Sequence, residues 1–147
     1  MERLTFEGFS IEAPPGWEEL HEDGTFSDPA EGDRRIFGRP GSPGVVVVSL
    51  LQHSSEAPDA SLRDHAGELA RTWGRARGLT SPLTIASQTR PDGALAIAEY
   101  RLAGEYVAVW YLASEELTLQ AAYTCAWKLR DEERALREKM IASMTFA

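Results

Sequence analysis

The residue types that usually carry metal chemistry are few in this chain and widely spaced. The three histidines are His21, His53 and His65, and no His-x-His or His-Glu-x-x-His spacing joins any of them to a second ligand. The acidic run Glu18–Asp23 contains ligands for a hard cation, but it lacks the EF-hand pattern and is typical of a solvated loop. We therefore predict no metal site.

The single cysteine, Cys125, is the strongest candidate nucleophile by residue type. It lies on the apolar side of an alternating segment, so we expect a buried thiol rather than the exposed thiolate that catalysis needs. No Gly-x-Ser-x-Gly or Walker motif is present. The loop Gly38–Gly44 contains two prolines and precedes no helix, which makes it a poor phosphate site. We predict no catalytic residues, no cofactor and no enzymatic activity.

The composition is that of one globular domain covering residues 1–147, with 43% hydrophobic and 26% charged residues. The formal net charge of −8 repels a phosphate backbone, so we expect no nucleic-acid partner. The longest apolar runs, Val45–Leu51 (interrupted by Ser49) and Tyr106–Ala113, are far shorter than the roughly 20 residues of a membrane span. Because the first ten residues contain no signal-peptide core, we expect a cytoplasmic protein without membrane insertion.

Two segments have helical periodicity. The first should begin after an N-cap at Ser61 and end before Gly78, which suits the position after a C-cap. The second should run from Asp131 to Met144, with acidic residues in its first turn and basic residues nearer its end, as the helix dipole favours. The expected apolar faces are Leu62, Ala66, Leu69, Trp73 and Ala76 in the first helix, and Leu136, Met140 and Met144 in the second.

Alternation of apolar and polar residues predicts an antiparallel sheet of about six strands. Its C-terminal part should be a four-strand meander, because turns of three or four residues separate four alternating segments. Val45–Leu51 is apolar on both sides and should lie centrally. Eight segments have strand-like patterns, of which about six should form this sheet: Leu4–Ala13, Gly24–Ser27, Arg35–Gly38, Val45–Leu51, Leu83–Arg90, Leu95–Leu102, Tyr106–Leu112 and Leu117–Lys128. With two main helices packed on this sheet, the predicted fold class is α+β.

The register of the meander follows if each hairpin closes symmetrically on its turn. Trp110 then lies opposite Leu119, and Tyr100 lies opposite both Ala108 and Ile85, which gathers apolar side chains on one face. The other face is mixed, with a small apolar centre among polar residues. Two interpretations remain open for it: it is covered by a helix or by the N-terminal segment, or it is a binding face.

Three short motifs, in this order of elements, resemble the PsbP-like superfamily. Phe9–Trp17 is similar to the family's opening strand followed by prolines and Gly-Trp. The meander carries Gly93 and Tyr100, and Ile141–Phe146 is similar to the family's closing helix and Ser-Phe tail. The resemblance covers nearly the whole chain, and we assign it to the DcrB-related bacterial branch, although the lipoprotein leader of many DcrB relatives is not seen.

This resemblance implies an antiparallel sheet flanked by helices. It also implies a function as an adaptor, chaperone or assembly factor rather than an enzyme. Examples in the superfamily are the photosystem extrinsic protein, a small import factor that binds the GTPase Ran, and the Eag chaperones of type VI secretion effectors. Since a fold does not fix a function, this is an expectation only.

Our first hypothesis is a non-enzymatic protein-binding module, an adaptor or chaperone associated with secretion or with a toxin. An apolar segment of another protein would dock on the mixed sheet face, and a homodimer closed by that face is the other partner considered. The expected docking residues are Ile97, Val107, Val109 and Tyr111, with Glu99, Arg101 and Gln120 as polar guides.

The alternative hypothesis is a small-molecule carrier. An apolar pocket between the sheet and a helix would lie near Trp73, Trp110 and Tyr123. The two hypotheses differ in what they require of the mixed face, which must be open in the first and can be covered in the second.

Overall fold

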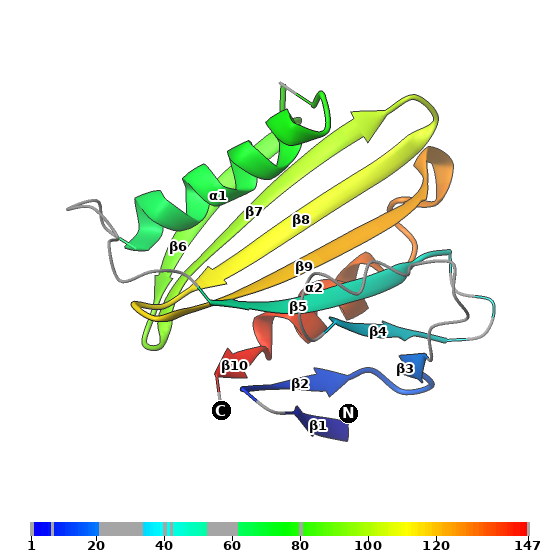
Figure 1. Cartoon of the computed structure of the whole chain (residues 1–147). Coiled ribbons are helices and arrows are strands. Elements are labelled where there is room, and N and C mark those ends of the chain that lie inside the picture. The colour runs from blue at the N-terminus through cyan, green and yellow to red at the C-terminus, as the bar shows by residue number, and fades with distance from the viewer. Residues whose placement is uncertain are drawn as a thin grey trace.

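The computed structural model of the chain describes residues 2–6, 8–20, 34–39, 41, 43–52, 62–79 and 81–146. Within these residues, ten strands form two antiparallel sheets and two α-helices flank the larger sheet (Figure 1). The strands are β1 (Glu2–Phe6), β2 (Phe9–Ala13), β3 (Glu18–Leu20), β4 (Arg34–Gly38), β5 (Val45–Gln52), β6 (Thr84–Arg90), β7 (Gly93–Leu102), β8 (Glu105–Ala113), β9 (Leu117–Ala126) and β10 (Thr145–Phe146). The helices are α1 (Leu62–Ala76), the 3₁₀ helix η1 (Trp127–Leu129) and α2 (Arg134–Ala142).

The α+β fold class is confirmed, with more strands than the sequence predicts. The larger sheet has seven strands in the order β3-β4-β5-β9-β8-β7-β6, and the smaller has three in the order β1-β2-β10. The expected C-terminal meander is β6 to β9. The expected strand Gly24–Ser27 lies outside the described residues. In the central strand β5, Val46 and Val48 are fully buried on one side, while Val45 and Val47 are half-buried on the other.

The N-terminal segment forms a hairpin where the sequence predicts one strand. The chain turns at Gly8, whose φ of 93° lies in the left-handed region, and β1 then pairs with β2. A Cβ atom at this position would overlap the side chain of Leu50 in the larger sheet, so glycine also permits the close approach of the two sheets. Strand β10 pairs on the other side of β2, and the Ser10 and Thr145 hydroxyls are 2.9 Å apart.

The register of the meander corrects the sequence prediction. Each of the three turns contains only two unpaired residues, because pairing continues closer to the turn than expected and the Ser114 N–H donates to the Leu117 carbonyl. The expected lengths were four, three and four residues, in chain order. In the β6–β7 and β8–β9 hairpins the shift is two residues, which leaves every side chain on its expected face: Trp110 pairs with Ala121 and still shares a face with Leu119.

In the β7–β8 hairpin the shift is one residue. Tyr100 pairs with Val107 instead of Ala108, because the turn contains only Ala103 and Gly104 and Ala103 takes a φ of 52°. A shift of one residue moves each side chain of a strand to the other face of the sheet. Relative to β8 and β9, every side chain of β6 and β7 therefore lies on the face opposite to the predicted one.

Helix α1 begins and ends where the periodicity predicts. At its C-terminus, Gly78 has a φ of 76°, its N–H donates to the Arg75 carbonyl at 3.1 Å, and the Leu79 N–H donates to the Gly74 carbonyl at 2.8 Å. These two bonds make a Schellman motif. The expected N-cap, Ser61, lies outside the described residues.

The buried stripe of α1 differs from the expected one. The buried residues are Ala66, Gly67, Ala70 and Gly74, whereas Leu62, Leu69 and Trp73 are half-buried and Ala76 is exposed. These small residues let the helix lie close to the sheet. The Tyr100 hydroxyl donates to the Ala70 carbonyl at 3.2 Å, and a Cβ atom on Gly74 would overlap that hydroxyl.

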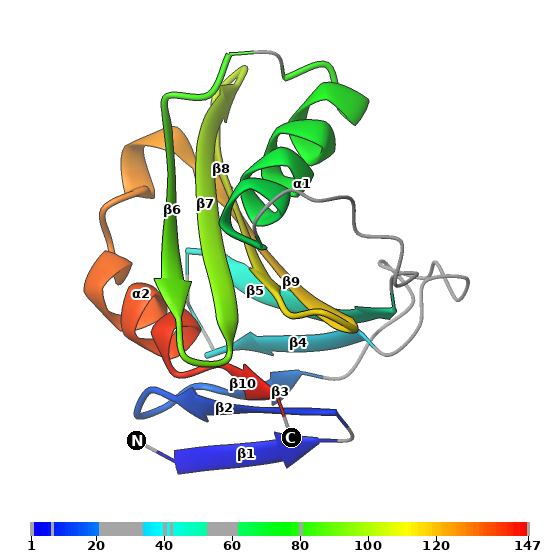
Figure 2. The ribbon, with the colours of Figure 1, turned by 90° about the vertical axis from the view of Figure 1, so that its left-hand side faces the viewer.

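Helix α2 packs on the face of the sheet opposite to α1, and the chain continues from it into β10 of the small sheet (Figure 2). It begins at Arg134, three residues later than expected, after η1 and a turn in which Glu133 has a φ of 59°. Leu136, expected on the apolar line, is 37% exposed. The side chains that α2 and the following turn bury are Arg137, Met140, Ile141 and Met144.

Candidate functional site

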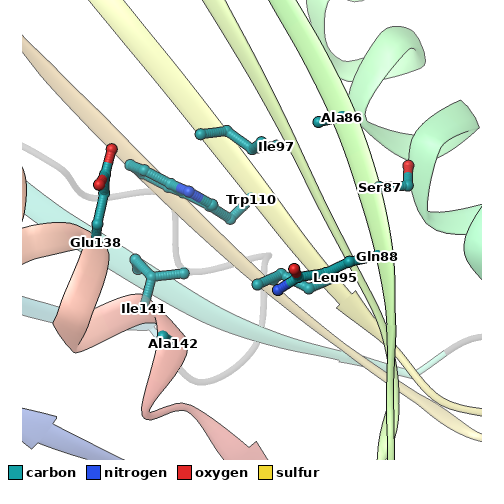
Figure 3. Close-up of a pocket in the computed structure, with 9 residues that line it drawn as sticks. All are labelled: Ala86, Ser87, Gln88, Leu95, Ile97, Trp110, Glu138, Ile141 and Ala142. Carbon is teal, nitrogen blue, oxygen red and sulfur yellow. The ribbon is translucent and has the colours of Figure 1, made fainter.

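The larger sheet is hollowed on the α2 face. A groove of about 300 Å³ lies between the end of the meander and α2 (Figure 3). Its lining residues come from β6 (Ala86, Ser87 and Gln88), β7 (Leu95 and Ile97), β8 (Trp110) and α2 (Glu138, Ile141 and Ala142).

The register of the meander builds the floor of this groove. Ile97 pairs with Trp110 on β8 and with Ala86 on β6, so these three side chains cross the sheet in one row. Leu95 pairs with Gln88 and forms the next row along the strands. Figure 3 shows the Trp110 ring extending from the sheet toward Glu138. The result is an apolar floor below a rim that carries one carboxylate.

An arginine side chain lies at each end of the groove. At one end, Arg134 donates to the Glu99 carboxylate at 3.2 Å, and the Tyr106 hydroxyl donates to the same oxygen at 2.5 Å. At the other end, Arg90 donates to the Met144 carbonyl at 2.7 Å and forms an ion pair with Asp92 at 3.1 Å. Arg134 connects the α2 segment to the sheet through Glu99, and Arg90 connects β6 to the carbonyl of Met144 after α2.

The rim of the groove carries one acidic side chain. The Glu138 carboxylate lies 3.7 Å from the Arg134 guanidinium, and its side chain is 52% exposed. Gln88 and Ala142 are also exposed on the two sides of the groove. An occupant of the groove would therefore meet apolar atoms below and a partly solvated carboxylate at one side.

A buried arginine anchors the N-terminal part of α2 beside the groove. Arg137 is 1% exposed, and its guanidinium lies over the rings of Tyr123 at 4.4 Å and Tyr106 at 5.4 Å. It donates to the carbonyls of Arg130 at 2.6 Å and Glu132 at 2.9 Å. Sequence reasoning assigned Arg137 to the helix dipole. Its spacing from Met140 and Ile141, three and four residues away, was the available sign that it shares their buried stripe.

The environment of these tyrosines opposes ionisation. Burial, followed by the hydrogen bond to Glu99, raises the pKa of Tyr106 from 10.0 to about 12. Burial also raises the pKa of Tyr123. Both rings therefore remain neutral at ordinary pH and act as packing surfaces for Arg137.

The seven expected docking residues do not share one surface, which corrects the sequence prediction. Ile97 lines the groove and Glu99 lies at its end, while Arg101 is exposed on the same face with its guanidinium 4.4 Å from the Trp127 ring. The remaining four lie on the opposite face, which carries α1. Of these, Val107, Val109 and Tyr111 are buried, and Gln120 donates to the Tyr111 hydroxyl at 2.8 Å. The one-residue register shift at the β7–β8 turn is the cause.

The expected pocket near three aromatic residues is also divided by the sheet. Trp73 packs on the α1 face, 6.2 Å from the Tyr100 ring. Trp110 and Tyr123 belong to the core on the α2 face. Of the three, only Trp110 lines the groove.

The remaining candidates for chemistry are structural where the chain is described. Cys125 is 5% exposed, and burial raises the pKa of its thiol, so the buried cysteine is confirmed. From the acidic run, Glu19 forms an ion pair with Arg35 at 3.0 Å. His21 and His53 lie outside the described residues. Within those residues, no group of three His, Cys, Asp or Glu side chains could hold a metal ion.

Comparison with solved structures identifies the fold. Cyanobacterial PsbP (CyanoP) from Synechocystis sp. PCC 6803 superposes with a TM-score of 0.68 at 12% identity, over 99% of this chain and 92% of that one. The fold is PsbP-like. This confirms the architecture that the Gly-Trp entry and the meander resemble, whereas membership of the DcrB-related branch stays a prediction. No family model and no curated protein matches the sequence.

Two further structures share the PsbP-like fold at 14% identity and a TM-score of 0.59. One is a protein from Bacteroides thetaiotaomicron VPI-5482, of which this chain spans 48% while 99% of this chain is covered. The other is LpqN of Mycobacterium tuberculosis, described as involved in cell envelope biogenesis, with 95% of this chain and 83% of that chain covered. At such identities the likeness concerns the fold alone. Within the described residues, no helix is long and apolar enough to span a membrane.

Proposed function

We propose that this protein is a non-enzymatic binding module whose groove accepts an apolar segment of another protein. The observation that carries the proposal is the open groove of about 300 Å³ with Ile97 and Trp110 in its floor. Aromatic side chains at the bottom of a desolvated recess are typical anchors of protein interfaces. A function as a secretion- or toxin-associated chaperone, and the cytoplasmic location, stay predictions.

The chemistry of the lining favours binding over catalysis. Glu138 is the one ionisable side chain among the nine lining residues, and the hydroxyl of Ser87 lies against Gly67 of α1 on the other face of the sheet, so it is not placed beside that carboxylate. The buried Cys125 belongs to the core and does not line the groove. Apolar contact area is what the groove offers to an occupant.

A small-molecule carrier is the second candidate. The groove volume of about 300 Å³ lies at the lower end of the range for ligand pockets, roughly 300 to 1,000 Å³. We prefer a protein segment because the exposed residues Ala86 and Gln88 of β6 line one side of the groove, where a polypeptide could continue on either side of its buried residue.

Site-specific photo-crosslinking in the native host tests this proposal. A photoreactive amino acid replaces Gln88, an exposed residue that lines the groove from β6, and the mass of the adduct is measured after irradiation. We expect one discrete polypeptide adduct. A second change, Ala142→Trp, should abolish the adduct because the indole fills the groove from its exposed side.

The matched control is Ala135→Trp on the same helix. Ala135 is exposed and does not line the groove, so this variant should form the adduct normally. Both variants should keep their stability within about 0.5 kcal/mol, because both positions are on the surface. An adduct of metabolite mass would support the carrier instead. A polypeptide adduct that both tryptophan variants retain would contradict binding in the groove.

A further inference from the structure

The strand next to the groove is an edge of the larger sheet. Strand β6 pairs with β7 on one side, and among the described strands none pairs with it on the other (Figure 2). Alternate residues of an edge strand direct their backbone N–H and C=O groups away from the sheet. These groups form a template on which a further extended chain can pair.

The residues of this edge lack the usual protection against pairing. Leu83–Thr89 contains no charged residue and no proline. Three of these residues, Thr84, Ile85 and Thr89, are β-branched and favour strands. Leu83, just before the strand, is 55% exposed. Charged side chains, prolines and short length are the common means of blocking an edge, and this segment has none of them.

The opposite edge of the same sheet is protected. Strand β3 has only three residues, and two of them are Glu18 and Glu19. The outer strand of the small sheet, β1, carries Glu2 and Arg3, and Arg3 forms an ion pair with Glu12 at 3.1 Å. Compared with these two edges, β6 is long, and its one charged residue is Arg90 at its C-terminal end.

The β6 edge and the groove are parts of one surface. Ala86 and Gln88, two residues apart on β6, point to the α2 face and line the groove. Directly paired side chains on neighbouring strands lie about 4.5 to 5.5 Å apart at Cβ. A strand added to β6 would therefore direct every second side chain toward the groove, beside Ala86 and Gln88.

We propose that an extended segment of a partner protein binds by adding a strand to β6 and placing an apolar side chain in the groove opposite Ala86. This inference rests on the proposed function and specifies how the partner is held. Main-chain hydrogen bonds to β6 supply affinity, and the groove selects the side chain. The rim carboxylate of Glu138 favours a lysine or arginine two residues from the apolar anchor, on the same side of the added strand.

Charge argues for a partner segment rather than a second copy of this chain. The chain has a net charge of −8, so two copies repel each other. A basic, apolar strand from another protein satisfies both the groove and its rim.

The test uses the full chain and linear random peptides displayed on phage, long enough to pair with all of β6. Peptides are selected on the natural sequence and counter-selected on Ala142→Trp. We expect enriched peptides to alternate, with an apolar residue and a basic residue two positions apart. Methylating single backbone nitrogens of such a peptide should weaken binding about tenfold or more at alternate positions and little between them. This period of two is the signature of strand addition.

Amide hydrogen exchange on the protein provides the second measurement. Binding should protect alternate amides of β6 between Thr84 and Thr89. Protection confined to α2 and the floor of the groove would overturn strand addition and leave the proposed function standing. Failure to enrich any peptide would also overturn it, whatever the crosslinking shows. Dimerisation that protects the same β6 amides without peptide would assign the edge to a second copy and overturn the proposal.

Discussion

The two faces of the seven-stranded sheet carry a helix each, yet one is closed and the other is hollow. On the closed face, the small residues of α1 pack against the sheet; they are Ala66, Gly67, Ala70 and Gly74. The residues that β7 contributes to this face are also small, namely Ala94, Ala96 and Ala98. On the hollow face, β7 presents Leu95 and Ile97, and the nine-residue α2 covers less of the sheet than the fifteen-residue α1.

The size of the side chains explains the difference. Small residues on both surfaces let the backbones approach until no space remains. On the other face, larger side chains separate α2 from the sheet. Beside the C-terminal half of α2, the side chains of Leu95, Ile97 and Trp110 form the floor of the groove. The alternation of β7, small on one side and large on the other, therefore decides which face contains the groove.

The strongest test of this contrast places a carboxylate on each face. Val109→Glu buries an unpaired charge under α1, where Val109 is 0% exposed, and should destabilise the protein by more than about 4 kcal/mol. Ile97→Glu places the same group in the groove, where it can reach water, and should cost about 1 to 2 kcal/mol. Urea denaturation followed by circular dichroism measures both.

The two variants also separate folding from binding. Ile97→Glu should fold and lose the crosslinked partner, because its carboxylate replaces part of the apolar floor. A folded Val109→Glu protein of near-natural stability would show that the α1 face is not closed.

The second prediction concerns the closeness of α1 to the sheet. Replacing glycine by alanine inside a helix usually stabilises it by about 1 kcal/mol. At Gly74 the new Cβ would overlap the Tyr100 hydroxyl and lie 2.9 Å from the Leu79 carbonyl oxygen, so Gly74→Ala should instead destabilise by about 2 kcal/mol. Thermal denaturation, evaluated at the midpoint, gives the sign.

Gly67→Ala is the matched control in the same helix. The nearest atom to its new Cβ would be the Ser87 hydroxyl oxygen at 3.0 Å, which can rotate away, and the Arg71 guanidinium at 3.8 Å is in ordinary contact, so the change should stay within about 0.5 kcal/mol of neutral. Equal stabilisation by both substitutions would show that α1 is not held at the distance described.

The smallest effect is confined to high pH. Because the pKa of Tyr106 is raised to about 12 in the folded protein, the unfolded chain loses this proton first as the pH rises. The contribution of Tyr106 to stability is therefore complete below pH 10 and is lost between pH 10 and 12. Tyr106→Phe should reduce the slope of stability against pH in this window. Ultraviolet titration should show fewer tyrosines ionising near pH 10 than the sequence contains, and a full set of normal titrations would contradict the buried tyrosine cluster on the α2 face.

Much of the fold could be predicted from local patterns. The periodicity of small and apolar residues located α1, and Gly78 marked its end, because only a left-handed residue completes the Schellman motif there. Alternation located the four meander strands. The segment before Ala13 was harder, since Gly8 interrupts it as a turn that alternation alone does not reveal.

The candidate site could be predicted only in part. Ile97 and Trp110 were singled out from the sequence, in two different hypotheses, and the structure brings them together as a cross-strand pair. Val109 and Tyr111 were assigned to the same surface as Ile97 because the β7–β8 turn was expected to hold three residues. Alanine rarely adopts a positive φ, so the sequence gives no sign that Ala103 has a φ of 52°. The number of residues in this turn, and with it the face of each β7 side chain, could therefore not be deduced.

By itself, the sequence located both α-helices, the central strand β5 and the four meander strands, because hydrophobic period and turn residues act over a few positions. It also determined that Cys125 is buried. Only the tertiary structure decided which face each strand presents, how far α2 extends across the sheet, and that Arg137 is buried between two tyrosines. The faces of the strands depend on whether the β7–β8 turn contains two or three residues. The extent of α2 and the burial of Arg137 depend on contacts between residues distant along the chain, which produce no periodic pattern in the sequence.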